Sequence, residues 1–150
     1  MKSFLLTLSL FPISAKVTAA QEIVKIEITC NDQMMFNTKK FEVNVGDKVA
    51  LTLKNTGKIP LKTMGHNLVI LHPGTPLAVF AGKAAADKKE ALPQEPEMRK
   101  FIFANTRRLG GGESHTIHFI PKIAGEFPFI CTTPGHFSQM QGVMSVKEKD

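Results

Sequence analysis

The sequence predicts an all-β fold, an eight-stranded Greek-key β-sandwich or barrel with one helical insertion around residues 77–92. Three observations support this prediction. Apolar and polar residues alternate with a period of two in most segments, which is the pattern of half-buried strands. Short clusters of Gly, Asn and Asp separate these segments, as turns do in sandwiches and barrels. A single stretch has a helix-forming composition, and prolines flank it.

The first third of the chain contains three predicted strands. In each of them the alternation places the apolar side chains on one face of a sheet. The three segments are residues 23–30, 41–45 and 49–54. Turn-forming residues separate them, with Asn-Asp-Gln at 31–33 and Gly-Asp at 46–47.

The middle of the chain departs from this alternation. Residues 68–71 form a continuous apolar run, which predicts a strand buried on both faces. Residues 77–92 are rich in Ala and Lys, and Pro76 and Pro93 flank them. We expect one helix here, within a long excursion from residue 72 to about residue 98.

The strand pattern returns in the last third of the chain. The four further predicted strands are residues 100–104, 115–120, 127–131 and 144–146. Three consecutive glycines at 110–112 provide a flexible turn between the first two of these strands. With the four earlier strands they give eight, in a single domain of residues 21–150.

Residues 1–20 have the features of a secretory signal peptide. Lys2 supplies a positive start, residues 4–13 a short apolar region, and residues 17–20 small side chains for cleavage. The apolar region is too short to span a bilayer as a helix, and no later stretch is long enough. We therefore expect an exported protein that is not inserted in a membrane after cleavage.

The chain is mildly basic, with a formal charge of +6 that becomes 6 − 2 = +4 without Lys2 and Lys16. The remaining charges are scattered, which favours solubility or attraction to an acidic partner. No dense Lys/Arg tract is present, and the chain has no Trp or Tyr. We therefore expect no binding to nucleic acid.

One short stretch concentrates metal-binding side chains, with Cys131, His136 and Met140 at separations of five and four. A predicted strand leads into it, and Thr-Thr-Pro-Gly at 132–135 breaks that strand into a tight loop. His66, within Met-Gly-His-Asn, offers a further donor. Two His, one Cys and a weak Met are the donors of blue-copper electron-transfer sites.

Each of these residues has an ordinary interpretation when taken alone, as a buried apolar side chain or a surface histidine. Their combined spacing favours a copper site. In that site the Cys131 thiolate and the imidazoles of His66 and His136 would surround the ion in a plane. Met140 would be a long axial ligand, and the Gly65 carbonyl would face the metal from the opposite side because glycine has no side chain to block it.

The two cysteines permit one alternative to this site. In an exported protein they would ordinarily suggest a disulfide. A bond between Cys30 and Cys131 would consume the thiol of the candidate metal loop. We therefore expect Cys30 to be a buried free thiol on the apolar face of the first strand, with a long-range disulfide as the alternative.

Three short segments carry a resemblance to a known family. They are Asn-Asp-Gln-Met at 31–34 with Phe-Asn-Thr at 36–38, Met-Gly-His-Asn at 64–67, and Cys-Thr-x-Pro-Gly-His at 131–136 followed by Met140 and Gly142. In these segments the chain resembles the azurins, within the cupredoxin or type 1 blue copper family. The resemblance implies a cupredoxin-like sandwich and a plastocyanin/azurin-like domain with one type 1 copper, which transfers single electrons in the periplasm.

The resemblance also implies roles for residues around the metal. Asn67 would tie the two ligand segments together, and the Thr133 backbone N–H would donate to the Cys131 sulfur. An apolar patch would dock the partners through Met34, Ile59, Met64, Pro134 and Phe137. The implied partners are redox proteins such as c-type cytochromes or a periplasmic reductase or oxidase, and we expect a monomer.

The chain departs from the azurins in several places. Azurins usually pin their first strands with a disulfide, whereas the matching positions here are Val24 and Asp47. Polar Thr133, Ser138 and Gln139 stand where azurins have apolar residues, and they would surround the edge of the His136 ring.

Other functions remain as alternatives. A copper storage or delivery protein would use the same ligands, although seven methionines without a repeated Met motif favour the carrier. An enzyme such as a multicopper oxidase or copper nitrite reductase would need a second copper centre, usually marked by His-x-His, and the sequence contains no such pair. We therefore expect no enzymatic activity. A metal-free binding module would leave the convergence of four ligands unexplained.

Overall fold

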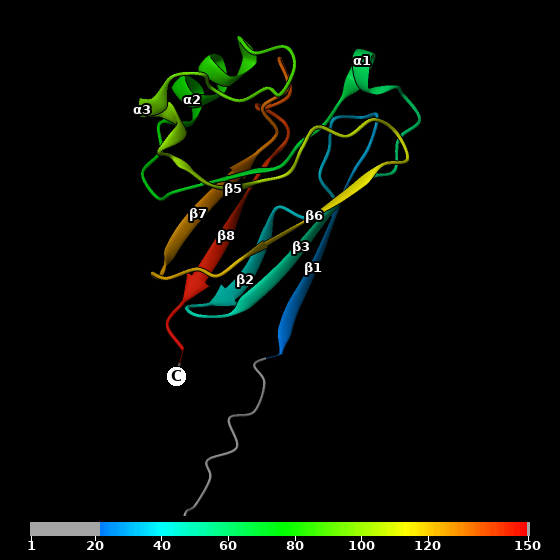
Figure 1. Ribbon diagram of the computed structural model, residues 1–150. Coiled ribbons are helices and arrows are strands. Elements are labelled where there is room, and N and C mark those ends of the chain that lie inside the picture. Colours follow the sequence, from blue (N-terminus) through cyan, green and yellow to red (C-terminus); the bar gives the residue numbers. More distant parts are fainter. Residues whose placement is uncertain (1–21, 150) are drawn as a thin grey trace, which may run out of the picture.

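Two β-sheets packed face to face form the body of the protein in the computed structural model, which describes residues 22–149 (Figure 1). The smaller sheet has the order β1 (Ile23–Cys30), β3 (Lys48–Asn55), β6 (Ser114–Phe119). The larger sheet has the order β2 (Lys40–Asn44), β8 (Gln141–Lys147), β7 (Gly125–Ile130), β4 (Val69–Leu71), β5 (Ile102–Asn105). The predicted eight strands and the sandwich are confirmed, and the sheets stay open rather than closing into a barrel.

The chain crosses repeatedly between the two sheets. β1, β2 and β3 lie alternately in the smaller, larger and smaller sheet, so β1 pairs in parallel with β3 and β2 pairs in parallel with β8. The remaining pairs are antiparallel. Parallel neighbours need such crossovers, because a tight hairpin can only join antiparallel strands.

The core fills the space between the sheets. Its fully buried side chains come from both layers and include Ile28, Leu51, Leu53, Leu68, Phe127, Phe129 and Met144. β4 is buried along its whole length, as the sequence predicts. Ile70 faces this core, whereas Val69 and Leu71 pack on the other side of the sheet against Phe80 of helix α2 (Leu77–Ala85).

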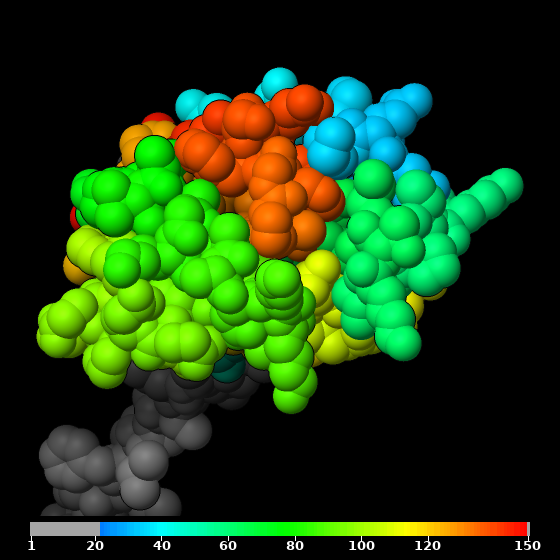
Figure 2. Space-filling view, turned by 90° about the horizontal axis from the view of Figure 1, so that it is seen from above, coloured from blue at the N-terminus to red at the C-terminus, as the bar shows by residue number. Residues whose placement is uncertain are grey.

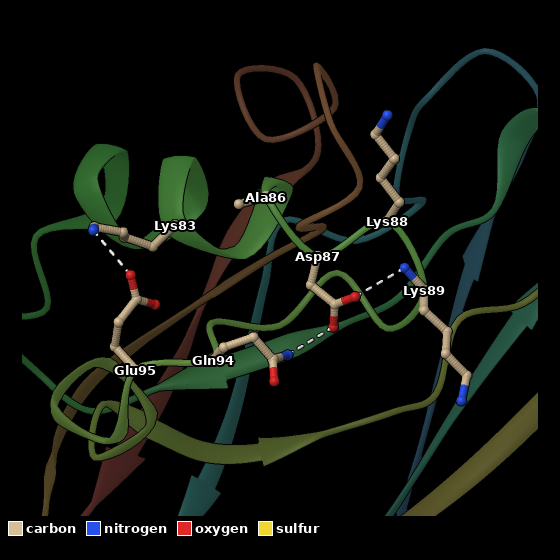
Figure 3. Close-up of a pocket in the computed structure, with 7 residues that line it drawn as sticks. All are labelled: Lys83, Ala86, Asp87, Lys88, Lys89, Gln94 and Glu95. Carbon is tan, nitrogen blue, oxygen red and sulfur yellow. Dashed lines mark hydrogen bonds and ion pairs between the residues drawn. The ribbon is translucent and has the colours of Figure 1, made fainter.

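The helical insertion differs from the prediction. Helix α2 (Leu77–Ala85) ends well before residue 92, so the prediction of one helix over residues 77–92 is wrong in its second half. The Asp87 carboxylate accepts hydrogen bonds from the Lys89 backbone N–H at 2.9 Å and from Gln94 Nε2 at 2.9 Å (Figure 3). Asp side chains that bond to nearby backbone compete with the helical pattern in this way.

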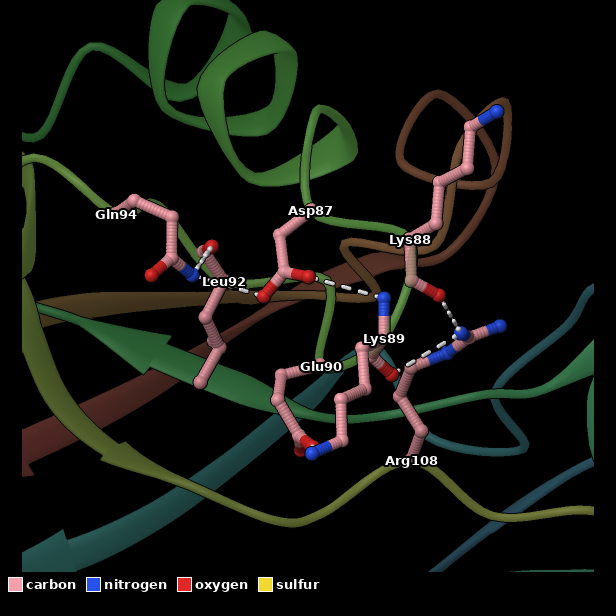
Figure 4. A network of polar contacts seen from close by, with 7 residues as sticks. All are labelled: Asp87, Lys88, Lys89, Glu90, Leu92, Gln94 and Arg108. Atoms are coloured by element: carbon pink, nitrogen blue, oxygen red, sulfur yellow. Dashed lines mark hydrogen bonds and ion pairs between the residues drawn. The ribbon is translucent and has the colours of Figure 1, made fainter.

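Contacts from distant segments hold the loop that follows α2. Arg108 Nη1 donates to the carbonyl oxygens of Lys88 at 2.8 Å and Lys89 at 3.3 Å (Figure 4). The Thr132 hydroxyl donates to the Ala91 carbonyl oxygen. A longer α-helix would need its own amides to reach these carbonyls, so the tertiary contacts take the place of helical hydrogen bonds.

Two short helices complete the structure, α1 (Leu61–Met64) and α3 (Pro96–Arg99), neither of which the sequence pattern predicts. All three helices lie at one end of the sandwich, together with the loop that joins β7 to β8 (Figure 1). None of the helices within residues 22–149 has the length and apolar character needed to cross a membrane. The predicted signal peptide, residues 1–20, lies outside the described residues.

Candidate metal centre

The loop between β7 and β8 is folded by its own backbone hydrogen bonds. His136 N donates to Thr133 O at 3.0 Å, with Pro134 and Gly135 between them and Gly135 at φ +82°. This is a type II turn, in which the third position needs a positive φ. Met140 N then donates to His136 O at 2.9 Å, and Cys131 N donates to Met140 O at 2.9 Å, which closes the loop.

The upstream segment reaches the same end of the sandwich between α1 and β4. His66 pairs with Leu109, since His66 N donates to Leu109 O at 3.0 Å and Leu109 N donates to His66 O at 2.7 Å. This bridge fixes the backbone of His66 to the chain that leaves β5. The imidazole is fully buried, so its position is set by packing as well as by the backbone.

The structure brings three of the predicted donors together. His136 Nδ1 lies 3.2 Å from His66 Nδ1 and 3.7 Å from Cys131 Sγ. One donor atom from each of the three residues lies within 4.8 Å of the other two, and all three side chains are buried. A thiol and two imidazoles facing one point, without a carboxylate, are a donor set that suits copper.

The two predicted axial groups lie in the same region. Met140 is fully buried in the core cluster that contains Cys131, and its own backbone closes the ligand loop onto Cys131. The Gly65 carbonyl precedes His66 and accepts a hydrogen bond from the Thr133 hydroxyl at 2.6 Å. This side-chain link is absent from the sequence prediction, which placed the Thr133 backbone N–H on the Cys131 sulfur and the Thr133 side chain at the edge of the His136 ring.

Asn67 joins the two ligand segments through its side-chain amide. Its Oδ1 accepts from Thr132 N at 2.9 Å, and its Nδ2 donates to Thr132 Oγ1 at 2.8 Å. Both residues are buried, and they are 65 positions apart in the sequence. Because buried polar pairs are costly to break, this link holds the segments that carry His66 and Cys131 in one arrangement.

The buried environment keeps the copper-free donors uncharged. Burial raises the pKa of the Cys131 thiol, and hydrogen bonds from the backbones of Asn67 and Thr133 act in the opposite direction. Burial and the neighbouring His136 lower the pKa of His66 to about 4, and burial followed by Arg108 lowers the pKa of His136. Both imidazoles are therefore neutral at pH 7, which is the form that binds a metal.

Among the three candidate ligands, His136 is the one that reaches the surface. It retains 7% exposure, whereas His66 and Cys131 have none. In the view onto this end, the ligand loop (orange) lies between α2 (green) and the segments around residues 31–37 (blue) and 58–64 (blue-green) (Figure 2). Among the predicted docking residues, Pro134 is exposed, and the other four are half-buried: Met34, Ile59, Met64 and Phe137.

Two hollows lie on the α2 side of the molecule. One, of about 210 Å³, lies between small residues of α2 and the ligand loop, and Thr133, Pro134 and Phe137 line it. The other, of about 520 Å³, lies over the loop that follows α2 (Figure 3). It is lined by charged and polar side chains that include the Lys83–Glu95 ion pair at 2.9 Å, and none of the candidate ligands contributes to it.

The lowered pKa of His66 predicts a loss of stability in mild acid for the copper-free protein. The unfolded state takes up a proton near pH 6.5, whereas folded His66 does so only near pH 4. Stability from this group is therefore present above pH 6.5 and declines as the pH falls toward 4. We expect the free energy of unfolding to fall by about 2 kcal/mol between pH 7 and pH 5, measured by urea denaturation.

A pair of variants isolates this contribution. His66→Gln removes the buried imidazole and should make the stability less dependent on pH over this interval. His118→Gln removes an exposed histidine of β6 and should leave the dependence unchanged. Equal pH dependence in the His66→Gln variant and the unmodified protein would contradict the prediction.

Comparisons with known proteins agree with this geometry. Residues 22–147 match the family of copper-binding proteins described as the plastocyanin/azurin family. Azurin from Bordetella pertussis is 35% identical over 137 residues, covering 89% of each chain. Outer membrane protein H.8 from Neisseria meningitidis is 39% identical over 123 residues, which cover 79% of this chain and 65% of that protein. Reduced auracyanin from Roseiflexus castenholzii superposes with a TM-score of 0.72 at 34% identity, covering 82% of this chain and 96% of that one.

Proposed function

The chain belongs to the plastocyanin/azurin family of copper-binding proteins, and we propose that it carries single electrons between redox partners as a type 1 blue copper protein of the periplasm. The observation that carries this proposal is the convergence of Cys131, His66 and His136 in a buried group without a carboxylate. Copper is the cofactor of this family. When bound, it supplies one-electron chemistry by alternating between Cu(II) and Cu(I).

The protein's own contribution is a set of donors that do not need to move. The Cys131 sulfur suits Cu(I), and the imidazoles of His66 and His136 suit both oxidation states. The backbone bridge between His66 and Leu109 and the hydrogen bonds between Asn67 and Thr132 hold the segments that carry these donors in place. A fixed arrangement of this kind lets an electron enter or leave without the cost of rearranging ligands and solvent.

Met140 and Gly65 complete the proposed ligand set. The Met140 thioether and the Gly65 carbonyl oxygen would be further, weaker donors to the copper. The Thr133 hydroxyl already donates a hydrogen bond to that carbonyl oxygen and so uses one of its two lone pairs. Gly65 would therefore be a weak donor to the copper.

The surface around His136 is the proposed place where partners dock. Of the three candidate ligands His136 alone retains some exposure, and Pro134 and Phe137 lie beside it in the same loop. The proposed partners are c-type cytochromes or a periplasmic reductase or oxidase, and the positive charge of the chain would attract acidic ones. The protein would act as a monomer and as a carrier, without a catalytic reaction of its own.

Loading the purified protein with Cu(II) tests this function. We expect an intense blue colour from thiolate-to-copper charge transfer and rapid reduction by reduced cytochrome c. A colourless product would contradict the blue-copper assignment. A blue protein that fails to exchange electrons but transfers copper readily to an acceptor would instead be a copper storage or delivery protein.

A further inference from the structure

A positively charged side chain lies beside the candidate ligands. Arg108 follows β5 and directly precedes Leu109, the residue that pairs with His66. Its Nη1 donates to the carbonyl oxygens of Lys88 and Lys89 (Figure 4). Within residues 22–149, none of the ion pairs involves Arg108.

The guanidinium group lies against the backbone of the upstream ligand segment. Arg108 Nη2 is 3.0 Å from the position that a Cβ atom on Gly65 would occupy, and Gly65 directly precedes His66. The Nε atom of Arg108 is buried and has no hydrogen-bond partner within the described part of the chain. The charge is thus partly removed from water, where it is screened less than a surface charge.

The electrostatic effect of Arg108 extends to all three donors. After burial, Arg108 is the remaining cause that lowers the pKa of His136, and it makes a smaller contribution to the lowered pKa of His66. At Cys131 it acts against burial, which raises the pKa of that thiol. Asp32 opposes it at His66 alone among these three. The Asp32 carboxylate also accepts hydrogen bonds from backbone N–H groups at 2.8 and 3.3 Å.

We propose that Arg108 is a fixed positive charge that raises the reduction potential of the copper centre. This proposal rests on the proposed electron-carrier function. The Cys131 thiolate contributes one negative charge and the two imidazoles none, so the centre has a net charge of +1 with Cu(II) and zero with Cu(I). Arg108 therefore repels the oxidised centre alone, and the one electron taken from the donor protein removes that repulsion without making or breaking a bond.

Three substitutions separate the charge of Arg108 from its hydrogen bonds. Arg108→Gln and Arg108→Met remove the charge, whereas Arg108→Lys keeps it in a different shape. In equilibrium with the same electron donor, we expect the ratio of reduced to oxidised copper protein to be about tenfold lower in the two neutral variants. This corresponds to a reduction potential that is lower by roughly 59 mV for one electron. Arg108→Lys should keep most of the original potential. Cyclic voltammetry of the copper-loaded proteins measures these values.

Arg107→Gln is the matched control. Arg107 is the adjacent arginine, it is exposed, and it pairs with Glu113 at 2.9 Å, so its removal should change the potential far less than the removal of Arg108. Hydrogen exchange in residues 86–91 of the copper-free variants reports whether the loop held by Arg108 has loosened. This readout does not depend on the metal.

The outcomes distinguish the possible causes. A lower potential in both neutral variants but not in Arg108→Lys supports the proposal, even if all three loosen the loop. An equal fall in all three variants would assign the effect to the loop and overturn it, as would an unchanged potential in the neutral variants. A wild-type protein without a reversible one-electron wave would contradict the electron-carrier function itself.

Discussion

Replacing Cys131 by serine is expected to remove the intense blue colour of the copper-loaded protein completely, and with it the rapid exchange of electrons with reduced cytochrome c. The Cys131 sulfur lies 3.7 Å from His136 Nδ1 and belongs to the single group of possible metal ligands found within residues 22–149. A serine hydroxyl stays protonated at neutral pH, is a poor donor for Cu(I), and provides no thiolate for charge transfer. Visible absorption and stopped-flow reduction measure the two losses.

Cys30→Ser is the control for this experiment, because Cys30 is the other cysteine of the chain. Burial raises the pKa of Cys30 to about 12, with smaller contributions from the neighbouring Cys131 and Asp32. Its thiol therefore remains protonated at pH 7, and Cys30 lies outside the group of possible metal ligands formed by His66, Cys131 and His136. We expect the blue colour to persist in this variant. Colour that survives Cys131→Ser, or that disappears in a folded Cys30→Ser protein, would refute the assignment of the copper thiolate.

The fold could be predicted largely because its strands are signalled locally. The alternation in residues 23–30 and the apolar run at 68–71 report directly which side chains are buried. The wrong helix end in the insertion arises instead from contacts with distant segments. The composition of residues 77–92 reports helix propensity, but Arg108 and Thr132 bind the carbonyl groups beyond α2. Such contacts override propensity and leave no trace in the local pattern.

The candidate metal site also has a part that the sequence predicts and a part that it does not. The spacing of Cys131, His136 and Met140 within one loop is visible in the sequence, because a turn of fixed geometry brings them together. The hydrogen bond between Thr133 and Gly65 joins residues 68 positions apart, and the contact of Arg108 with Lys88 joins residues 20 apart. Both contacts depend on how distant segments pack in the folded protein. The polar character of Thr133 and Arg108 in the sequence therefore could not reveal which residues they contact.

Phe129→Ala is expected to cost about 3–5 kcal/mol of the free energy of unfolding, the range for a large aromatic residue removed from a closed core. Phe129 is fully buried in β7, and its ring centroid is 5.7 Å from those of both Phe36 and Phe41. It pairs with Gly142 of β8, where a Cβ atom would come within 2.3 Å of Phe129 Cζ. The ring therefore fills the space above Gly142, and its removal opens a cavity that this glycine cannot fill.

The cavity would lie beneath the strands that hold the metal loop. β7 leads into Cys131, and β8 begins directly after Met140, so the packing of Phe129 stabilises both ends of that loop. Urea denaturation of the copper-free protein measures the loss, with Ile123→Ala as the control. Ile123 is 58% exposed and should change the stability by no more than about 0.5 kcal/mol. A loss below about 1 kcal/mol for Phe129→Ala would contradict the prediction, because it would mean that the surrounding side chains close over the gap.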